Sequence, residues 1–303
     1  MKVPAGRPGR RLPEGQSTSH VMGLPDGRLL SFATIGDPGG EPVIFCHSIP
    51  GSRLFPEHAA TLAEELGLRV IVPERPGFGL SDFQPGRTIR DVTHDIGLLA
   101  DALELDRFRV LGASSGCAYV LACCAEFPQR IERATIMAGI TPDDYAGPLH
   151  SALPAPARYV LQRAMWASVM LHRLLVFGMV RDPDRAVQAL ARQLGPADQH
   201  VLERPDAARF IVGTTLEGSR RGVHGLAYDA SLLNRPWEIP LESIPASLPL
   251  SFWCGDNDLA TPLAHGRALA GRVPHATVRV LENCGHFGVF FDHLREILLE
   301  LIG

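Results

Sequence analysis

One stretch, Phe108 to Ala118, constrains the fold of this chain more than any other. It reads as a short apolar strand, then Gly-x-Ser-x-Gly, then the start of a helix. A serine on so tight a strand-to-helix turn needs neighbours without side chains, which Gly112 and Gly116 supply. The turn lifts the hydroxyl of Ser114 off the sheet edge, and the following helix directs its N-terminal amides towards the same point. Such a serine predicts a nucleophile, provided that the chain also supplies a base and an oxyanion site.

Apolar runs of strand length alternate with helical patterns on both sides of this stretch, and the alternation predicts the fold class. A hairpin over Val21–Ile35 comes first. The predicted strands that follow are 42–46, 68–73, the stretch from Phe108 up to Gly112, 131–140, 248–254 and 277–281, and the predicted helices are 56–66, 88–105, 116–126, 262–272 and 289–302. Continuous apolar strands separated by helices are typical of an α/β fold, in which a mostly parallel sheet carries helices on both faces.

The alternation stops after Pro142 and resumes with the strand that begins at Leu248. Between these points the sequence shows no convincing strand and only helical patterns, over 158–180, 185–194 and 207–216. We therefore predict a core domain from residues 21–142 and 241–303, with residues 143–240 inserted as a helical cap, or lid. Residues 1–20 are rich in Pro, Gly and Arg and are predicted to be a flexible tail.

Charge and composition exclude several classes of partner. The formal net charge is −4, with no acidic or basic block, so nothing indicates binding to nucleic acid or to an anionic membrane surface. Lys2 is the only lysine, which leaves no base for a Ser-Lys dyad, no Schiff base and no phosphate-loop lysine. No spacing of His, Cys, Asp or Glu resembles a metal site, and we expect neither a metal nor an organic cofactor.

The six cysteines predict a reducing compartment. None forms a Cys-x-x-Cys pair, and nearly all lie in apolar runs, where free buried thiols are the common state. The N-terminus shows no apolar segment of a secretion signal. The most apolar later stretch, Ala167–Val180, is interrupted by His172 and Arg173 and is too short to span a bilayer. We expect a cytoplasmic protein, a monomer or homodimer, whose partner is a small-molecule substrate.

Two loops that follow predicted strands carry the groups that an exposed serine needs. In open parallel sheets, reactive groups gather beyond the carboxyl ends of the strands. One such loop contains Asp256 and Asp258, and another contains His286. The chain order Ser, Asp, His is the one associated with this kind of turn. We predict that His286 accepts the proton of Ser114 and that an aspartate holds its other ring nitrogen.

Two aspartates compete for that middle role. Asp258 lies further from the strand, just before Thr261-Pro262, which reads as an N-cap followed by proline at the first helical position. Asp256 is placed to bond its own loop backbone, as aspartates in turns commonly do. The sequence favours Asp258 over Asp256, and Asp143 and Asp144, at the end of an earlier strand, form a third option.

The oxyanion of a tetrahedral intermediate needs backbone N–H donors. The amide of Ser115 is one natural donor, because it stands at the start of the helix that follows the nucleophile. The second donor is expected from the loop after strand 42–46, where Ile49 follows His47-Ser48 and Pro50-Gly51 fixes the turn. We predict an oxyanion hole made by these two amides.

Four stretches, in order, make the chain resemble the α/β-hydrolase superfamily, and the resemblance covers nearly all of it from Val21 onward. They are His47–Gly51, similar to the family's His-Gly-x-Pro-Gly oxyanion loop; Arg75–Ser81, similar to its Arg-Pro-Gly-x-Gly-x-Ser turn; Gly112–Gly116, the nucleophile elbow; and Gly255–Asp258 with Gly285-His286, the acid and base loops. The resemblance implies an eight-stranded sheet, a triad of Ser114, Asp258 and His286, and a helical cap over the site.

One residue departs from the family pattern, because Ser48 stands where glycine is usual. Its side chain either contributes a hydroxyl donor beside the oxyanion loop or is merely tolerated there, and we favour the second interpretation. The elbow residue is a serine rather than an aspartate. That difference excludes a dehalogenase or an epoxide hydrolase that works through an aspartyl ester.

The residues that touch substrate are predicted from the loops near the elbow and from the aromatic residues of the cap. Cap aromatics most often form the cap's own core, so we expect only two or three of them to face the site. The candidates for substrate binding are His47, Ser48, Tyr145, Trp166 and Phe287. The remaining cap aromatics are Tyr159, Phe177, Phe210, Tyr228 and Trp237.

These residues predict a serine hydrolase, most simply a carboxylic ester hydrolase, that cleaves a small-to-medium, largely uncharged ester or lactone through an acyl-enzyme. The near balance of 11 arginines and 10 acidic residues in the cap motivates an uncharged substrate. The same triad supports C–C bond hydrolysis, amide or peptide cleavage, and acyl transfer or cyclisation in a biosynthetic pathway. A second class is a non-hydrolytic ligand-binding or oxygen-handling protein on the same fold.

Overall fold

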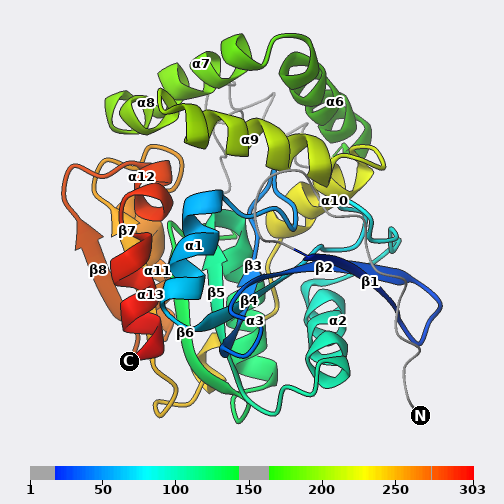
Figure 1. The fold of residues 1–303 in the computed structure, drawn as a ribbon, viewed down its shortest axis with the longest axis vertical. Coiled ribbons are helices and arrows are strands. Elements are labelled where there is room, and N and C mark those ends of the chain that lie inside the picture. Colours follow the sequence, from blue (N-terminus) through cyan, green and yellow to red (C-terminus); the bar gives the residue numbers. More distant parts are fainter. Residues whose placement is uncertain (1–17, 143–163, 274) are drawn as a thin grey trace.

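An eight-stranded, mostly parallel sheet forms the centre of the molecule (Figure 1). The structure is a computed structural model and describes residues 18–142, 164–273 and 275–303. The strands are β1 (Thr18–Gly23), β2 (Leu29–Gly36), β3 (Glu41–Cys46), β4 (Leu68–Pro73), β5 (Phe108–Ala113), β6 (Ile131–Met137), β7 (Leu250–Gly255) and β8 (Thr277–Leu281). Their order is β1-β2-β4-β3-β5-β6-β7-β8, with β2 antiparallel to both of its neighbours and all other pairs parallel. The predicted α/β fold with eight strands is confirmed.

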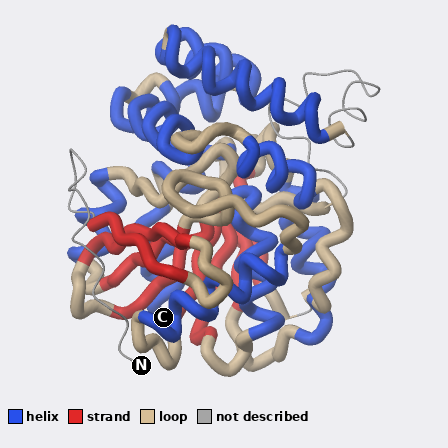
Figure 2. Tube along the Cα trace, turned by 90° about the vertical axis from the view of Figure 1, so that its right-hand side faces the viewer, coloured by secondary structure: helices blue, strands red, loops and turns tan. Residues whose placement is uncertain are grey.

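Helices cover both faces of this sheet, as the sequence predicts (Figures 1 and 2). One face packs against α1 (Glu57–Glu65), α12 (His286–Phe291) and α13 (Leu294–Ile302), and the other packs against α2 (Ile89–Ala102), α3 (Cys117–Glu126) and α11 (Leu263–Arg272). Two 3₁₀ turns, η1 (Ser114–Gly116) and η2 (Leu241–Ser243), complete the connections around the sheet. A sheet covered on both faces needs strands that are apolar throughout, and every residue of β7 is buried.

Local sequence signals set the ends of the helices. The hydroxyl of Thr88 accepts a hydrogen bond from the backbone N–H of Asp91, while the carboxylate of Asp91 accepts one from the backbone N–H of Thr88. This capping box begins α2. α1 ends just before Gly67, whose φ of +63° is a conformation that glycine adopts without strain.

Three predicted boundaries are wrong. β6 ends at Met137 rather than at residue 140, because Ala138 has φ of +47° and turns the chain out of the sheet. β1 begins at Thr18, inside the segment 1–20 predicted to be a tail, and residues 1–17 lie outside the described residues. The single closing helix predicted over 289–302 is two helices, α12 and α13, separated by Asp292-His293.

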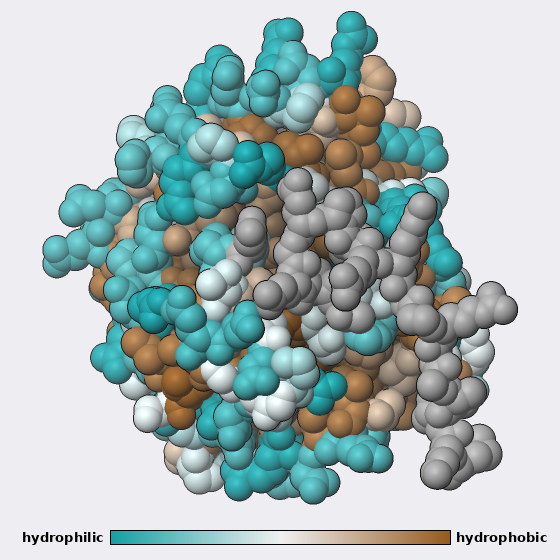
Figure 3. Space-filling model, in the orientation of Figure 1, coloured by the Kyte–Doolittle hydropathy of each residue, from teal (hydrophilic) through white to brown (hydrophobic). Residues whose placement is uncertain are grey.

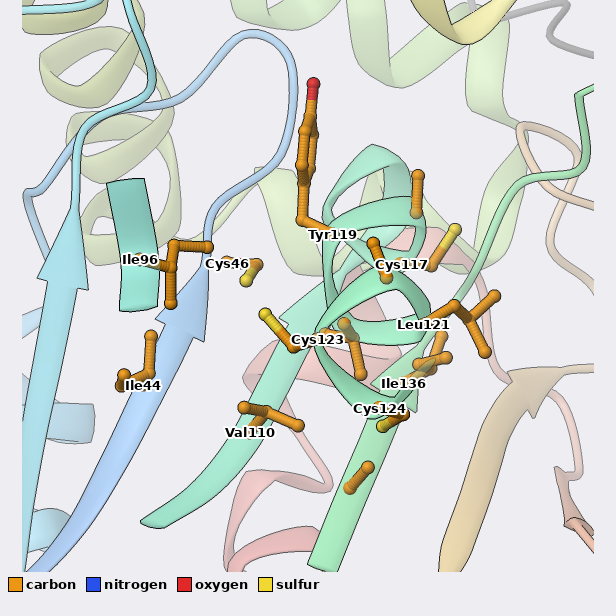
Figure 4. Packing of buried hydrophobic residues seen from close by; sticks show 14 of the residues in the cluster. Ile44, Cys46, Ile96, Val110, Cys117, Tyr119, Leu121, Cys123, Cys124 and Ile136 are labelled. Atoms are coloured by element: carbon orange, nitrogen blue, oxygen red, sulfur yellow. The ribbon is translucent and has the colours of Figure 1, made fainter. Parts of the chain in front are cut away.

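The cysteines are packing residues of the core. All six are free and buried. Four of them, Cys46, Cys117, Cys123 and Cys124, lie among the branched side chains between the sheet and α3 (Figure 4). Burial raises the pKa of Cys46 to about 12, which keeps the thiol protonated and unreactive at neutral pH.

A layer of helices lies above the carboxyl ends of the strands, and we call it the cap layer (Figures 1 and 2). It consists of α6 (Met165–Arg181), α7 (Pro183–Leu194), α8 (Pro196–Leu202) and α9 (Pro205–Gly218). α10 (His224–Leu233) follows, and its residues Ala230 and Leu233 belong to the same apolar cluster as the strands. The sequence patterns over 185–194 and 207–216 correspond to α7 and α9, whereas α8 and α10 are not predicted. The division of the chain into cap and core domains stays a prediction.

The outer face of α6 carries an exposed apolar stripe. It appears as a brown area at the upper right of Figure 3, where Figure 1 draws α6. The exposed side chains are Trp166, Met170, Leu174, Phe177 and Val180. Among the described residues, no helix is long and apolar enough to cross a membrane.

Candidate active site

β5 runs into the predicted turn, where Ser114 has φ of +52°. A non-glycine residue in the left-handed region is strained, as expected of a nucleophile held clear of its strand and helix. The adjacent glycines make the turn possible. A Cβ on Gly116 would overlap the backbone carbonyl oxygen of Cys46, and a Cβ on Gly112 would lie 2.5 Å from Cγ2 of Val120. Both glycines therefore do what the sequence predicts of them.

We expect Gly116→Ala to lower the free energy of unfolding by about 3 kcal/mol, because the added methyl group meets backbone that cannot rotate aside. Gly271→Ala is the matched control. Gly271 lies in α11, a Cβ there meets nothing within 4 Å, and the substitution is expected to stabilise the protein by less than about 1 kcal/mol. Urea denaturation measures both variants, and equal midpoints would contradict this account of the turn.

The base and the acid meet as the sequence predicts. His286 is the first residue of α12, and Asp258 lies in the loop after β7. Nδ1 of His286 and Oδ2 of Asp258 are 2.8 Å apart, and the Asp258 side chain is fully buried. Oδ1 of Asp258 accepts hydrogen bonds from the backbone N–H groups of Ala260, at 2.8 Å, and Thr261, at 2.7 Å. These contacts place the proton on Nδ1 and leave Nε2 as the proton acceptor.

The electrostatics of this pair suit a general base. Burial alone lowers the pKa of His286, but the charge of Asp258, its hydrogen bond and the charge of Asp198 together raise that pKa above its ordinary value. Burial raises the pKa of Asp258, and the charge and hydrogen bond of His286 outweigh it, so that pKa lies below its usual range. The carboxylate is therefore ionised wherever the imidazole titrates, and it stabilises the imidazolium.

The other aspartates take different positions. Oδ1 of Asp256 accepts a hydrogen bond at 3.3 Å from the backbone N–H of Cys284, which lies in the loop after β8 and not, as predicted, in the loop of Asp256 itself. Asp143 and Asp144 lie outside the described residues. Within the part of the chain that the structure describes, Asp258 is the carboxylate on the ring of His286.

Thr261 is not the helix N-cap that the sequence predicts. α11 begins at Leu263 without any side-chain cap. The hydroxyl of Thr261 instead lies 2.6 Å from Oδ2 of Asp258 and 3.1 Å from Nδ1 of His286. The N-cap prediction for Thr261 is wrong because this hydroxyl hydrogen-bonds the carboxylate of Asp258, a role that the local sequence does not reveal.

The predicted oxyanion loop borders the same site. His47, Ser48 and Ile49 follow β3 and line one cavity together with Ser114. The hydroxyl of Ser48 donates to the carbonyl oxygen of Pro50 at 3.2 Å, so it is engaged within its own loop. The guanidinium of Arg75 donates hydrogen bonds to the backbone carbonyl oxygens of His47 and Ser48 and so anchors the loop. These bonds hold the loop still, which a preorganised oxyanion site requires.

Ser114 and His286 both line a cavity of about 330 Å³. Its walls come from the strand ends, from α12 and from the cap-layer helices α6, α7 and α9. Among the described residues, no lysine, arginine, aspartate or glutamate lines it. The polar side chains of the lining, apart from the serines and His286, are His47, His172, Gln193, Thr214, Thr215 and Thr261. The site therefore combines a nucleophile and base with a mostly apolar chamber of small-molecule size.

The predicted substrate-binding residues divide into three groups. His47, Ser48 and Phe287 line the cavity. Trp166 does not: it is 73% exposed and is absent from the lining, to which α6 contributes residues further along the helix, from Leu171 to Met179. Tyr145 lies outside the described residues.

The other predicted residues, Ser115 and the remaining cap aromatics, take different positions relative to the cavity. Ser115 is buried in η1, where its hydroxyl makes no hydrogen bond. Among the remaining described cap aromatics, Phe210 lines the cavity, whereas Phe177, Tyr228 and Trp237 are absent from the lining.

One buried carboxylate next to the base, that of Asp198, is not predicted from the sequence. Asp198 belongs to α8, is fully buried, and accepts hydrogen bonds from the backbone N–H groups of His286 and Phe287. Its only sequence signal is an acidic residue in a seven-residue helix that no pattern predicts.

Comparison with known proteins identifies the family to which this fold belongs. The sequence profile described as the alpha/beta hydrolase fold matches residues 41–293. The chain belongs to the α/β-hydrolase family. A 2-hydroxy-6-oxononadienedioate/2-hydroxy-6-oxononatrienedioate hydrolase of Pseudomonas putida is 26% identical over 89% of this chain and 91% of its own length.

Solved structures of other α/β hydrolases share the fold. A thermophilic esterase from Thermogutta terrifontis superposes with a TM-score of 0.67 at 20% identity, covering 95% of this chain and 98% of its own. The enol-lactonase from Burkholderia xenovorans superposes with a TM-score of 0.62 at 18% identity, covering 91% and 97%. At these identities the similarity between this chain and the two solved structures shows a shared fold alone.

Proposed function

We propose that this α/β hydrolase is a serine hydrolase that cleaves a small-to-medium, largely uncharged ester or lactone through an acyl-enzyme on Ser114. The observation that carries the proposal is the cavity itself. It holds the serine and the histidine, and its described lining contains no charged carboxylate, lysine or arginine. An ionised substrate would lose its hydration there without gaining a partner, whereas an uncharged acyl group would bury apolar surface.

The mechanism follows from the arrangement of the groups. Oγ of Ser114 attacks the carbonyl carbon while its proton passes to Nε2 of His286. Asp258 accepts the hydrogen bond from Nδ1 and stabilises the imidazolium. The backbone amides of Ile49 and Ser115 bind the oxyanion. His286 then returns the proton to the leaving alcohol, and water, activated by the same histidine, hydrolyses the ester on Ser114.

The second candidate function is hydrolysis of a C–C bond by the same residues. The similarity to the Pseudomonas putida hydrolase over most of both chains favours it. That relative's name describes a dicarboxylate, however, and the described cavity lining offers no cation to pair with a carboxylate. Amide cleavage and acyl transfer use the same groups and rest on no separate observation.

A pair of isosteric substrates tests the proposal. We expect kcat/KM for p-nitrophenyl hexanoate to exceed that for mono-p-nitrophenyl adipate by at least ~30-fold, about 2 kcal/mol, because the adipate places an unpaired carboxylate in the cavity. Gln193→Arg, which puts a cation into the lining, is expected to reduce this ratio at least fivefold. Initial rates at matched pH measure both constants.

Two results would contradict the proposal. One is equal kcat/KM for the neutral and anionic esters in the wild-type protein. The other is cleavage of a 2-hydroxy-6-oxo-dienoate with a higher kcat/KM than any neutral ester or lactone, which would favour C–C hydrolysis instead.

A further inference from the structure

One carboxylate of the cap layer binds the backbone of the candidate base. Asp198, on α8, is fully buried. Its Oδ2 accepts a hydrogen bond from the backbone N–H of His286 at 2.8 Å, and its Oδ1 accepts one from the backbone N–H of Phe287 at 2.6 Å. Both oxygens of a cap-layer side chain are therefore bound to the backbone of the base and of its neighbour.

A glycine, Gly285, lies where Asp198 approaches the backbone. A Cβ on Gly285 would lie 2.5 Å from Cγ of Asp198, inside van der Waals contact. Gly285 has φ of −90° and ψ of −172°, an extended conformation open to any residue. The glycine before His286 is thus required by the approach of Asp198 and not by the backbone conformation.

We propose that Asp198 is a positioning residue for His286. Its carboxylate holds the cap layer against the backbone of the base and supplies a second negative charge that stabilises the imidazolium. The inference rests on the proposed function, in which His286 cycles between neutral and charged forms. Asp258 holds the ring at Nδ1, and Asp198 holds the backbone that carries it. The position and the proton affinity of His286 then depend on α8 lying against the start of α12.

The charges around the base support this role. Within the described part of the chain, the ionisable groups that raise the pKa of His286 are Asp258, from the loop after β7, and Asp198, from α8. Burial raises the pKa of Asp198, while the charge of His286 and the two backbone hydrogen bonds oppose that rise. Cys284 lies two residues before His286, and burial raises its pKa to about 12, so it stays neutral over the working range. Removing the negative charge of Asp198 should therefore lower the pKa of His286.

The test compares Asp198→Asn with Glu203→Gln, a carboxylate-to-amide control at the exposed end of α8. NMR titration of the histidine ring in each folded protein, which requires no turnover, measures the pKa of His286. We expect Asp198→Asn to lower this pKa by about half a unit or more, and Glu203→Gln to leave it unchanged. We also expect kcat for p-nitrophenyl hexanoate to fall about tenfold in Asp198→Asn, with KM changed less than threefold, because the base is displaced.

The acid limb of the pH–rate profile should move to lower pH with the NMR value, because the reaction needs neutral His286 and the pKa of that residue falls. An unchanged His286 pKa in Asp198→Asn would overturn the proposal, whatever the loss of rate or of thermal stability. If the wild-type protein turned over no ester, the proposed function would fail while the NMR shift still decided the role of Asp198.

Discussion

Replacement of Ser114 by alanine is expected to lower kcat for p-nitrophenyl esters by at least ~10⁴-fold, to the level set by binding and the oxyanion site. The strained turn holds this hydroxyl at the cavity that His286 also lines. Alanine has the same Cβ atom as serine, so we expect the backbone of the turn to keep its path in this variant. Stopped-assay kinetics and the melting temperature of Ser114→Ala measure the loss and show that the fold persists.

The control for this variant is the next residue. Ser115→Ala also removes a hydroxyl from η1, but that hydroxyl is buried and makes no hydrogen bond, and the backbone amide remains. We expect its kcat to stay within about threefold of wild type. A Ser114→Ala protein with more than about a tenth of wild-type activity would exclude Ser114 as the nucleophile.

Replacement of Asp258 by asparagine is expected to lower kcat by about 10³- to 10⁴-fold. An amide at this position donates towards Nδ1 of His286 and therefore favours the tautomer that carries its proton on Nε2, which cannot accept the serine proton. Pre-steady-state kinetics with a p-nitrophenyl ester should show that acylation is the step that slows.

Asp256→Asn is the matched control for Asp258→Asn, because both residues lie in the same loop and the carboxylate of Asp256 accepts a hydrogen bond from the backbone N–H of Cys284 at 3.3 Å, away from the ring of His286. Its kcat should change by less than about threefold. Equal losses in the two variants would mean that the loop as a whole, and not the carboxylate of Asp258, supports catalysis.

The sequence predicts the part of the site that lies on the sheet. Gly112, Ser114 and Gly116 are constrained by local geometry, because a strand-to-helix turn admits few residue types, and that geometry is visible in a single stretch. The positions of Asp258 and His286 follow from the rule that parallel strands end at one edge. Strand ends can be read from apolar runs, so the residues just beyond them can be placed together.

The part of the site made by the cap layer could not be predicted. α8 has seven residues and is recognisable only by its packing, so the burial of Asp198 against His286 has no local signature. The same limit explains the error at Trp166, since the sequence does not fix which face of α6 turns towards the cavity. Periodicity predicts a helix, and its orientation depends on tertiary contacts.

Covalent labelling tests whether Ser114 is the nucleophile. The protein is treated with a fluorophosphonate probe, which reacts with activated serine nucleophiles, and the adduct is located by peptide mass spectrometry. We expect one equivalent of adduct on Ser114, matching loss of ester turnover, and no adduct in Ser114→Ala. Persistent turnover without an adduct, or an adduct on another residue that accompanies inactivation, would contradict this expectation.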